Sequence, residues 1–179
     1  MEDALKDLLV KSGFTPVEQE EGTSDFPNLK GGYKARIAGL KRVIGDGDYG
    51  AYDFESLNLQ VVETIKGDKG DNRYLGKKYK FINEYSEDTS LDVRKRLLND
   101  LWSAGVKVTL SDDCKGLPTE EEKMEAAINE IRDQIVDQLV DVSAWEMKDK
   151  KDDSIKYQII KLVKEIKRPS EETEATPAF

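Results

Sequence analysis

The chain has 179 residues, of which 37% are hydrophobic and 36% are charged, and its formal net charge is −9. It contains no histidine and one cysteine, Cys114. A Ser-His-Asp triad, a Cys-His dyad, a histidine-ligated metal, an internal disulfide and a thiolate zinc cluster are therefore excluded. No run approaches the roughly eighteen apolar residues of a membrane span, and the acidic N-terminal segment lacks the features of a secretory signal. We expect a cytoplasmic protein without a cofactor.

The negative charge is unevenly distributed along the chain. Residues 1–29 hold 2 basic and 7 acidic residues, and residues 86–179 hold 15 basic and 22 acidic. Between Lys30 and Tyr85 the balance reverses, with 11 basic and 8 acidic residues. Because phosphate contacts are made by lysine and arginine, this middle stretch is compatible with a local phosphate-binding face.

The N-terminal segment predicts one short helix before the first strand. Between Asp3 and Gly13, apolar residues recur at helical spacing, at Leu5, Leu8 and Leu9. Gly13 is a typical helix stop. Residues 15–32 are polar and contain two prolines and several glycines, so we expect an irregular lead-in there.

Three strands are predicted next, separated by glycine-rich turns. The strands are expected at 33–37, 52–65 and about 77–85, and the turns at 45–50 and 66–72. In the first strand Tyr33, Ala35 and Ile37 share one face. In the second, the odd positions Leu57, Leu59 and Val61 are expected to face a core.

The even positions of the second strand are mostly polar, yet they include two large aromatic residues. Tyr52 and Phe54 fall on the same face as Ser56, Asn58 and Gln60. Large aromatic side chains on an otherwise solvated sheet face call for an explanation.

The C-terminal half returns first to helices and then to strands. Ser90 is a candidate N-cap of a helix that Gly105 closes, and residues 119–122 form a capping box for a second helix. Two β-rich runs, 139–147 and 155–166, predict a hairpin. Trp102 and Trp145 lie within apolar stripes and are expected in the core.

The predicted order is three strands, a helical insert and two strands. This is the order of a five-stranded OB-fold-like Greek-key barrel with a helical insert between strands 3 and 4, in a mainly β protein with helices. A split α+β sheet would give the same order. We divide the chain into 1–29, an N-terminal helix and lead-in; 30–168, the OB-fold-like nucleic-acid-binding domain; and 169–179, a disordered acidic tail.

Basic and aromatic residues on the three predicted strands form the candidate binding site. A protein that binds single-stranded DNA regardless of sequence combines aromatic platforms for bases with a cationic groove for phosphates. The alternative is an ordinary solvated face whose aromatics pack under the N-terminal helix. A one-residue change of register would invert the faces. The candidate residues are Lys34, Arg36, Tyr49, Tyr52, Phe54, Lys77, Lys78, Tyr79 and Lys80.

The tail is a second candidate site, for a protein partner. Its carboxylates, on Glu171, Glu172 and Glu174, can occupy the basic groove in place of DNA. Phe179 with its α-carboxylate can enter a partner's pocket. The alternative is a solubilising terminus without a partner.

Taken together, these segments resemble phage-encoded OB-fold single-stranded DNA-binding proteins. The similarity covers about residues 26–167, and the tail separately resembles the acidic, aromatic-ended tips of bacterial and phage single-stranded DNA-binding proteins. The tail keeps Pro177 and Phe179 but has no acidic run beside them. The segments that carry the resemblance are Leu29-Lys-Gly-Gly-Tyr-Lys-Ala-Arg-Ile37, Leu57-Asn-Leu-Gln-Val61, Lys66-Gly-Asp-Lys-Gly70, Trp102-Ser-Ala-Gly105 and the closing hairpin.

The resemblance implies a non-enzymatic protein that coats single-stranded DNA during phage replication or recombination in a bacterial cytoplasm. Its tail would recruit replication or recombination proteins or inhibit the protein's own binding of DNA. The oligomeric state stays open, and a homodimer is one alternative. The runner-up is an OB-like protein-interaction module that binds a replication or host factor. A Mg²⁺-dependent nuclease would need clustered carboxylates, which the sequence does not offer.

Overall fold

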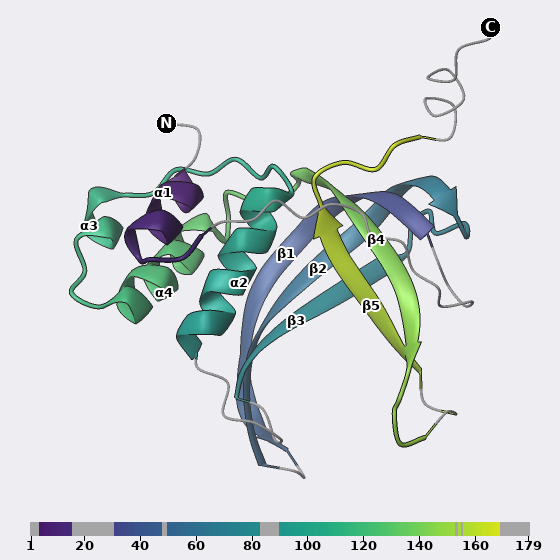
Figure 1. The fold of residues 1–179 in the computed structure, drawn as a ribbon, viewed down its shortest axis with the longest axis horizontal. Coiled ribbons are helices and arrows are strands. Elements are labelled where there is room, and N and C mark those ends of the chain that lie inside the picture. Colours follow the sequence, from purple (N-terminus) through teal and green to yellow (C-terminus); the bar gives the residue numbers. More distant parts are fainter. Residues whose placement is uncertain are drawn as a thin grey trace, which may run out of the picture.

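The computed structural model describes residues 4–15, 31–47, 50–82, 90–152, 154 and 156–168. Within them the fold is mainly β, with one five-stranded antiparallel sheet and helices on one side of it, as Figure 1 shows. The elements are α1 (Ala4–Lys11), β1 (Gly31–Gly47), β2 (Gly50–Gly67), β3 (Tyr74–Ile82), α2 (Ser90–Ser103), α3 (Asp112–Lys115), α4 (Glu120–Ile131), β4 (Leu139–Lys148) and β5 (Lys156–Val163).

The sheet has the strand order β3-β2-β1-β4-β5, with β1 at its centre. β1 pairs with β2 along its whole length, whereas only its first residues, Gly31 to Arg36, pair with β4. The β1–β2 and β4–β5 hairpins therefore extend away from the shared centre as two separate arms (Figure 1).

Helix α2 lies across the opening between the two edge strands. It contacts β3 and β5, which are not hydrogen-bonded to each other in the described residues. Tyr79 of β3 donates a hydrogen bond of 2.7 Å to Asp100 of α2, and Lys77 forms an ion pair of 3.2 Å with the same carboxylate. The helices thus cover one face of the sheet, and within the described residues no element covers the other face, which we call the uncovered face.

The core lies between this covered face and the helices, where the predicted alternation is confirmed. Tyr33, Ala35 and Ile37 of β1 are buried, and so are Leu57, Leu59 and Val61 of β2. From α1, Leu5, Leu8 and Leu9 join the same core cluster. The N-terminal helix therefore shares its core with the sheet.

The ends of the helices follow the capping signals in the sequence. Thr119 accepts a hydrogen bond from the Glu122 amide and Glu122 accepts one from the Thr119 amide, so the predicted capping box is present. α4 ends at Ile131, and Ile135 after it is still buried.

None of the helices in the described residues combines the length and apolar character that a membrane crossing requires.

Two predictions about the strands are wrong. Residues 45–47 belong to β1 and not to a turn, because Gly45, Asp46 and Gly47 pair with Tyr52, Ala51 and Gly50. Trp145 is only half-buried and lies on the uncovered face, since its neighbour Ala144 faces the core.

Candidate nucleic-acid interface

The uncovered face of the sheet carries a group of aromatic and basic side chains, in which Tyr52 and the lysines are exposed and Phe54 is half-buried. Because side chains alternate along β2, the buried positions Leu57 and Leu59 direct Tyr52 and Phe54 to the opposite face. Directly opposite residues share a face, so the pairing also places Lys41 of β1 and Lys78 and Lys80 of β3 there. We call Lys41, Tyr52, Phe54, Lys78 and Lys80 the cation–aromatic patch.

The two aromatic rings of the patch are neighbours on β2. Their centroids are 6.0 Å apart, and the ring planes are inclined by 39°. Lys78 Nζ lies 5.0 Å from the centroid of Phe54, within the range of a cation–π interaction. Lys41, Lys78 and Lys80 are exposed and form no ion pair with any described residue.

Tyr52 lies over the backbone of β1 at a glycine. A Cβ atom on Gly45 would lie only 2.6 Å from Cζ of Tyr52, so a larger residue there would require the ring to move. The ring is still 39% exposed. Gly45 therefore lets an aromatic ring cover the sheet surface while leaving part of the ring accessible.

Lys34 and Arg36 also lie on the uncovered face, but they are nearer the start of β1 than Lys41 is, and each lies beside a carboxylate. Arg36 forms an ion pair of 3.1 Å with Asp137 and a hydrogen bond with Gln60. Lys34 is opposite Glu63, whose pKa is lowered by hydrogen bonds from Arg168 and further by the charge of Lys34. These two residues share the face with the patch, although their charges are partly compensated.

Lys77 and Tyr79 lie on the other face, under the helices. Tyr79 is only 6% exposed, and burial beside Asp100 raises the pKa of its hydroxyl well above 10.0. Lys77 contacts Tyr79 and Asp100. Neither side chain is available to a ligand on the uncovered face, because alternation in β3 separates them from Lys78 and Lys80.

The remaining predicted residues, Tyr49, Glu171, Glu172, Glu174 and Phe179, lie outside the described residues. Two side chains on the uncovered face, Lys41 and Tyr74, were not predicted from the sequence, and Asn58 was predicted on this face but not as a binding residue. A register shift between Ile37 and Gly39 hid Lys41, because it reverses the alternation in β1. Tyr74, which is 68% exposed, falls between the turn predicted at 66–72 and the strand predicted from about residue 77, whereas β3 begins at Tyr74 itself.

On the covered side of the sheet, opposite the patch, ion pairs join the strands to each other and to the helices. Asp53 accepts two hydrogen bonds from Arg42, of 2.9 and 3.0 Å, which raise the pKa of the guanidinium. Arg42 also binds Glu125 of α4 at 2.8 Å.

A second pair joins β2 to the segment after α4. Glu55, almost fully buried, receives bonds of 2.5 and 2.6 Å from Arg132. Along β2 the two paired carboxylates, Asp53 and Glu55, alternate with the rings of Tyr52 and Phe54, so each ring is next in sequence to a residue held by an arginine.

Phe81 of β3 lies between two of the arginines on this side. The guanidinium carbon of Arg94 is 4.3 Å from its ring centroid, and that of Arg42 is 5.4 Å away. Arg94 is buried and forms an ion pair of 3.0 Å with Glu121. These contacts join α2 and α4 to the β1–β2–β3 arm.

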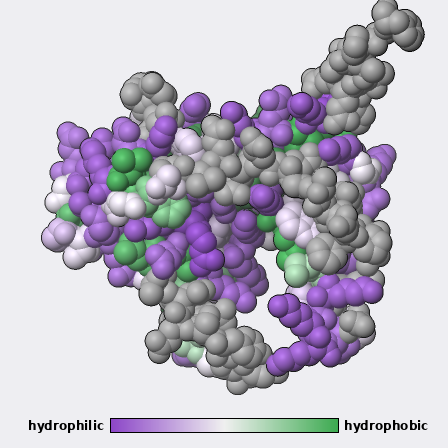
Figure 2. All heavy atoms as spheres, viewed as in Figure 1, coloured by the Kyte–Doolittle hydropathy of each residue, from purple (hydrophilic) through white to green (hydrophobic). Residues whose placement is uncertain are grey.

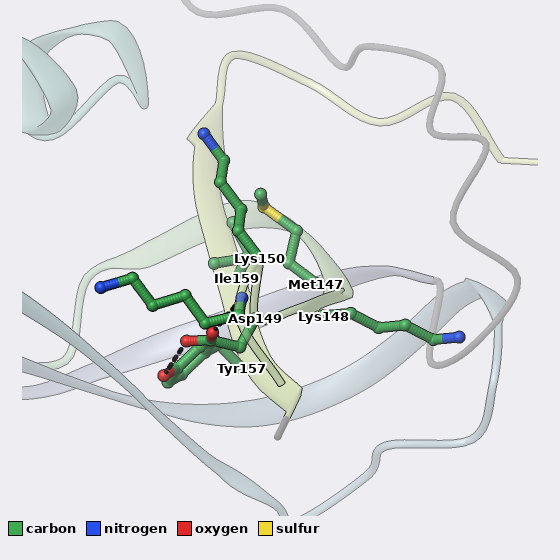
Figure 3. A pocket seen from close by; sticks show the side chains of 7 residues that line it. Met147, Lys148, Asp149, Lys150, Tyr157 and Ile159 are labelled. Atoms are coloured by element: carbon green, nitrogen blue, oxygen red, sulfur yellow. Dashed lines mark hydrogen bonds between the residues drawn. The ribbon is translucent and has the colours of Figure 1, made fainter. Parts of the chain in front are cut away.

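A shallow pocket of about 470 Å³ lies at the tip of the β4–β5 arm. Its walls combine Met147 and Ile159 with lysines 148, 150 and 151. In Figure 3 the Tyr157 hydroxyl contacts Asp149, to which it donates a bond of 2.8 Å. Two backbone amides of the turn also bind Asp149, and these contacts lower the pKa of its carboxyl. Figure 2 shows hydrophilic residues gathered at this arm, beside a hollow in the molecule.

Neither metal ligation nor thiol chemistry is indicated in the described part of the chain. No group of three or more potential ligands among histidine, cysteine, aspartate and glutamate occurs there. Cys114 is buried, and burial together with Glu130 raises the pKa of its thiol to about 11. The thiol is therefore a poor nucleophile at neutral pH.

No relative identifies the chain. The comparisons with protein-family models, curated proteins and solved structures gave no match.

Proposed function

We propose that this protein binds single-stranded DNA, largely independently of sequence, on the cation–aromatic patch. The observation that carries the proposal is the pairing of Tyr52 and Phe54 with three exposed lysines on the one face that the helices leave uncovered. Base–aromatic stacking contributes about 1–3 kcal/mol per base and is tolerant of sequence, because every base has a π-face. The lysines supply the attraction for phosphates.

The patch favours a single strand over a duplex. In a duplex the faces of the bases are stacked on one another and are not accessible to Tyr52 and Phe54. A duplex would contact the lysines alone and would lose the stacking energy. The protein as a whole is acidic, so binding depends on the local charge of this face and is expected to weaken steeply as salt is added.

The architecture supports an OB-fold-like barrel. The central position of β1 between β2 and β4 is compatible with this fold, and α2 occupies the opening between β3 and β5. In OB-folds the face of strands 2 and 3 and the β1–β2 and β4–β5 loops bind oligonucleotides. Lys148, Lys150 and Lys151 at the β4–β5 tip would then extend the contact with phosphates.

The proposed role is to coat transient single strands in phage replication or recombination, without performing chemistry. Arg168, just before the tail, forms an ion pair with Glu63 of β2 and contributes a second hydrogen bond of 3.0 Å. Arg168 is thus held against β2, the strand that also carries Tyr52 and Phe54. In the residues that follow, the carboxylates of Glu171, Glu172 and Glu174 are proposed to compete with DNA, and Phe179 to recruit a protein partner.

An electrophoretic shift assay across a salt series tests the proposal. The full chain should bind oligo-dT at low salt, bind a duplex of equal length much more weakly, and release both as salt increases. Equal affinity for the two forms, or no binding to either at low salt, would overturn it. The second result would favour the alternative of a protein-interaction module.

A further inference from the structure

A row of small residues crosses the uncovered face next to the cation–aromatic patch. Gly39 of β1, Asn58 of β2 and Gly76 of β3 are direct partners in the two strand pairings. Directly opposite residues point to the same side of a sheet, so this glycine row lies on the uncovered face. Across three strands, only Asn58 raises a side chain from the row.

Neither backbone conformation nor packing requires the two glycines. Both have φ angles outside the left-handed region, unlike Gly50 and Gly67 at the strand ends. A Cβ atom on Gly39 would meet nothing within 4 Å, and one on Gly76 would meet only Asn58 Oδ1, at 3.7 Å. A Cβ atom on Gly45, by contrast, would collide with the ring of Tyr52 as it now lies.

Glycine within a strand weakens the strand and often marks a place where a ligand comes close to the backbone. Gly39 and Gly76 flank the same residue on neighbouring strands, so space lies open above β1 and β3 on either side of the Asn58 side chain. The row is therefore a low strip across the three strands, and we call this strip the trough.

The walls of the trough carry side chains that suit a nucleic-acid strand. One wall is the row Lys41, Ser56 and Lys78, with Phe54 directly behind it. Lys41 and Lys78 are two strand spacings apart, about 10 Å, so that their side chains can reach different phosphates. The other wall holds Tyr74, whose ring is 68% exposed.

The floor of the trough offers one polar group. Asn58 is exposed, and its amide has no hydrogen-bond partner among the described residues. An amide can donate two hydrogen bonds and accept others without adding charge. It can therefore bind a phosphate or sugar oxygen that lies above the row.

We infer that the glycine row is the track of the sugar–phosphate backbone. Lys41 and Lys78 bind its phosphates, Asn58 donates to it from below, and the bases turn outward onto Phe54 on one side and Tyr74 on the other. This inference rests on the proposed binding of single-stranded DNA. It adds Gly39, Asn58, Gly76 and Tyr74 to the interface. It also sets the path of the bound DNA, which crosses β1, β2 and β3.

A series of side chains of increasing size at the two glycines tests the track. Gly39→Ala, Gly39→Val and Gly76→Val in the full chain should weaken binding of a labelled oligo-dT progressively, measured by fluorescence anisotropy. The valine variants should lose about tenfold or more in affinity, comparable to the loss of one stacked base. Their thermal midpoints should be equal to or higher than that of the parent, because valine favours a strand.

A charge placed on the floor gives an independent test. Asn58→Asp keeps the shape of the side chain and should repel the phosphates, so affinity should fall more than in the control Lys115→Gln. The control removes one positive charge from α3, among the helices, and lowers the net charge by the same amount.

The outcomes separate the inference from the proposal on which it rests. Strong binding by the parent chain and by both valine variants, with Asn58→Asp resembling its control, would overturn the track and leave the proposed function standing. Absence of oligo-dT binding by the parent at low salt would overturn both. A fall in affinity with unchanged thermal midpoints supports the track.

Discussion

Phe54 of β2 and Lys78 of β3 form a pair across two strands of the uncovered face, with Lys78 Nζ 5.0 Å from the ring centroid. A cation at this position stabilises the ring orientation by about 0.5–1 kcal/mol at an exposed site. It also places a positive charge beside the surface on which a base would stack. Stacking and phosphate binding are thus expected at adjoining points.

Removal of either ring should weaken DNA binding without unfolding the protein. Tyr52→Ala and Phe54→Ala should each reduce oligo-dT affinity by about 1–3 kcal/mol, the contribution of one stacked base. Quenching of intrinsic fluorescence on titration with oligo-dT measures the affinity. Tyr52→Phe is the matched control, because it keeps the ring and should bind nearly as well. If Phe54→Ala binds like the parent, the interface lies elsewhere.

The patch lysines should determine the salt dependence of binding. For single strands, the slope of log K against log salt changes by about 0.7 for each phosphate contact. Lys41→Ala and Lys78→Ala should therefore each make the slope shallower by about 0.7. Lys115→Ala on α3 is the control and should leave the slope unchanged. Unaltered slopes in all three variants would contradict phosphate binding by the patch.

The ion pair between Arg132 and Glu55 should make a large contribution to stability. Arg132→Met leaves the Glu55 carboxylate buried without its partner, which should cost about 3 kcal/mol in the free energy of unfolding. Urea denaturation measures this cost. Arg36→Met is the matched control, because its pair with Asp137 is exposed and should contribute at most about 1 kcal/mol. Equal losses in the two variants would show that burial of Glu55 is not decisive.

The buried hydroxyl of Tyr79 should make stability fall in alkaline solution. Burial and the neighbouring Asp100 raise its pKa in the folded state, so the folded protein holds this proton more tightly than the unfolded chain does. The resulting stability is fully present below pH 10.0, the ordinary pKa, and is lost as the pH rises from there toward the raised pKa.

Tyr79→Phe should cost about 1 kcal/mol at neutral pH, since one hydrogen bond is lost, and should flatten the decline above pH 10. Part of the decline should remain, because burial also raises the pKa of Tyr33. Urea denaturation at several pH values measures both effects. DNA affinity should be unchanged, and a clear loss of affinity would place Tyr79 in the interface after all.

Removal of residues 169–179 should leave DNA affinity equal or higher. The tail contributes three carboxylates and no basic residue. If these compete with DNA for the patch, their removal eliminates a local polyanion, and the gain should diminish as salt is added. Titrations with oligo-dT at low and moderate salt measure the change. A clear loss of affinity on truncation would contradict the autoinhibitory role.

The alternation of apolar and polar residues was sufficient to predict which way most of the sheet faces. Leu57 and Leu59 point inward, and Tyr52 and Phe54 therefore point outward. The capping box at Thr119 likewise fixed the start of α4. These predictions succeeded because burial and capping are local: each depends on residues within a few positions along the chain.

Features that depend on pairing between strands could not be read from the sequence. The register shift after Ile37 places Lys41 on the uncovered face, and the sequence of β1 contains no signal that predicts this shift. Tyr79 was included in the site because the register of β3 was undetermined, and alternation places it inward with Phe81. The glycine row was also hidden, because Gly39 and Gly76 become neighbours of Asn58 only once three strands are aligned.

The alternation along β2 limits how this protein can vary in length. Tyr52 and Phe54 reach outward, while Asp53 and Glu55 reach inward to Arg42 and Arg132. One residue inserted after Glu55 would reverse the faces of these four residues. The carboxylates would then lie on the uncovered face, and the rings would lie among the arginines. Unless a bulge absorbed the change, as one does in β1, insertions or deletions here are tolerable only in steps of two.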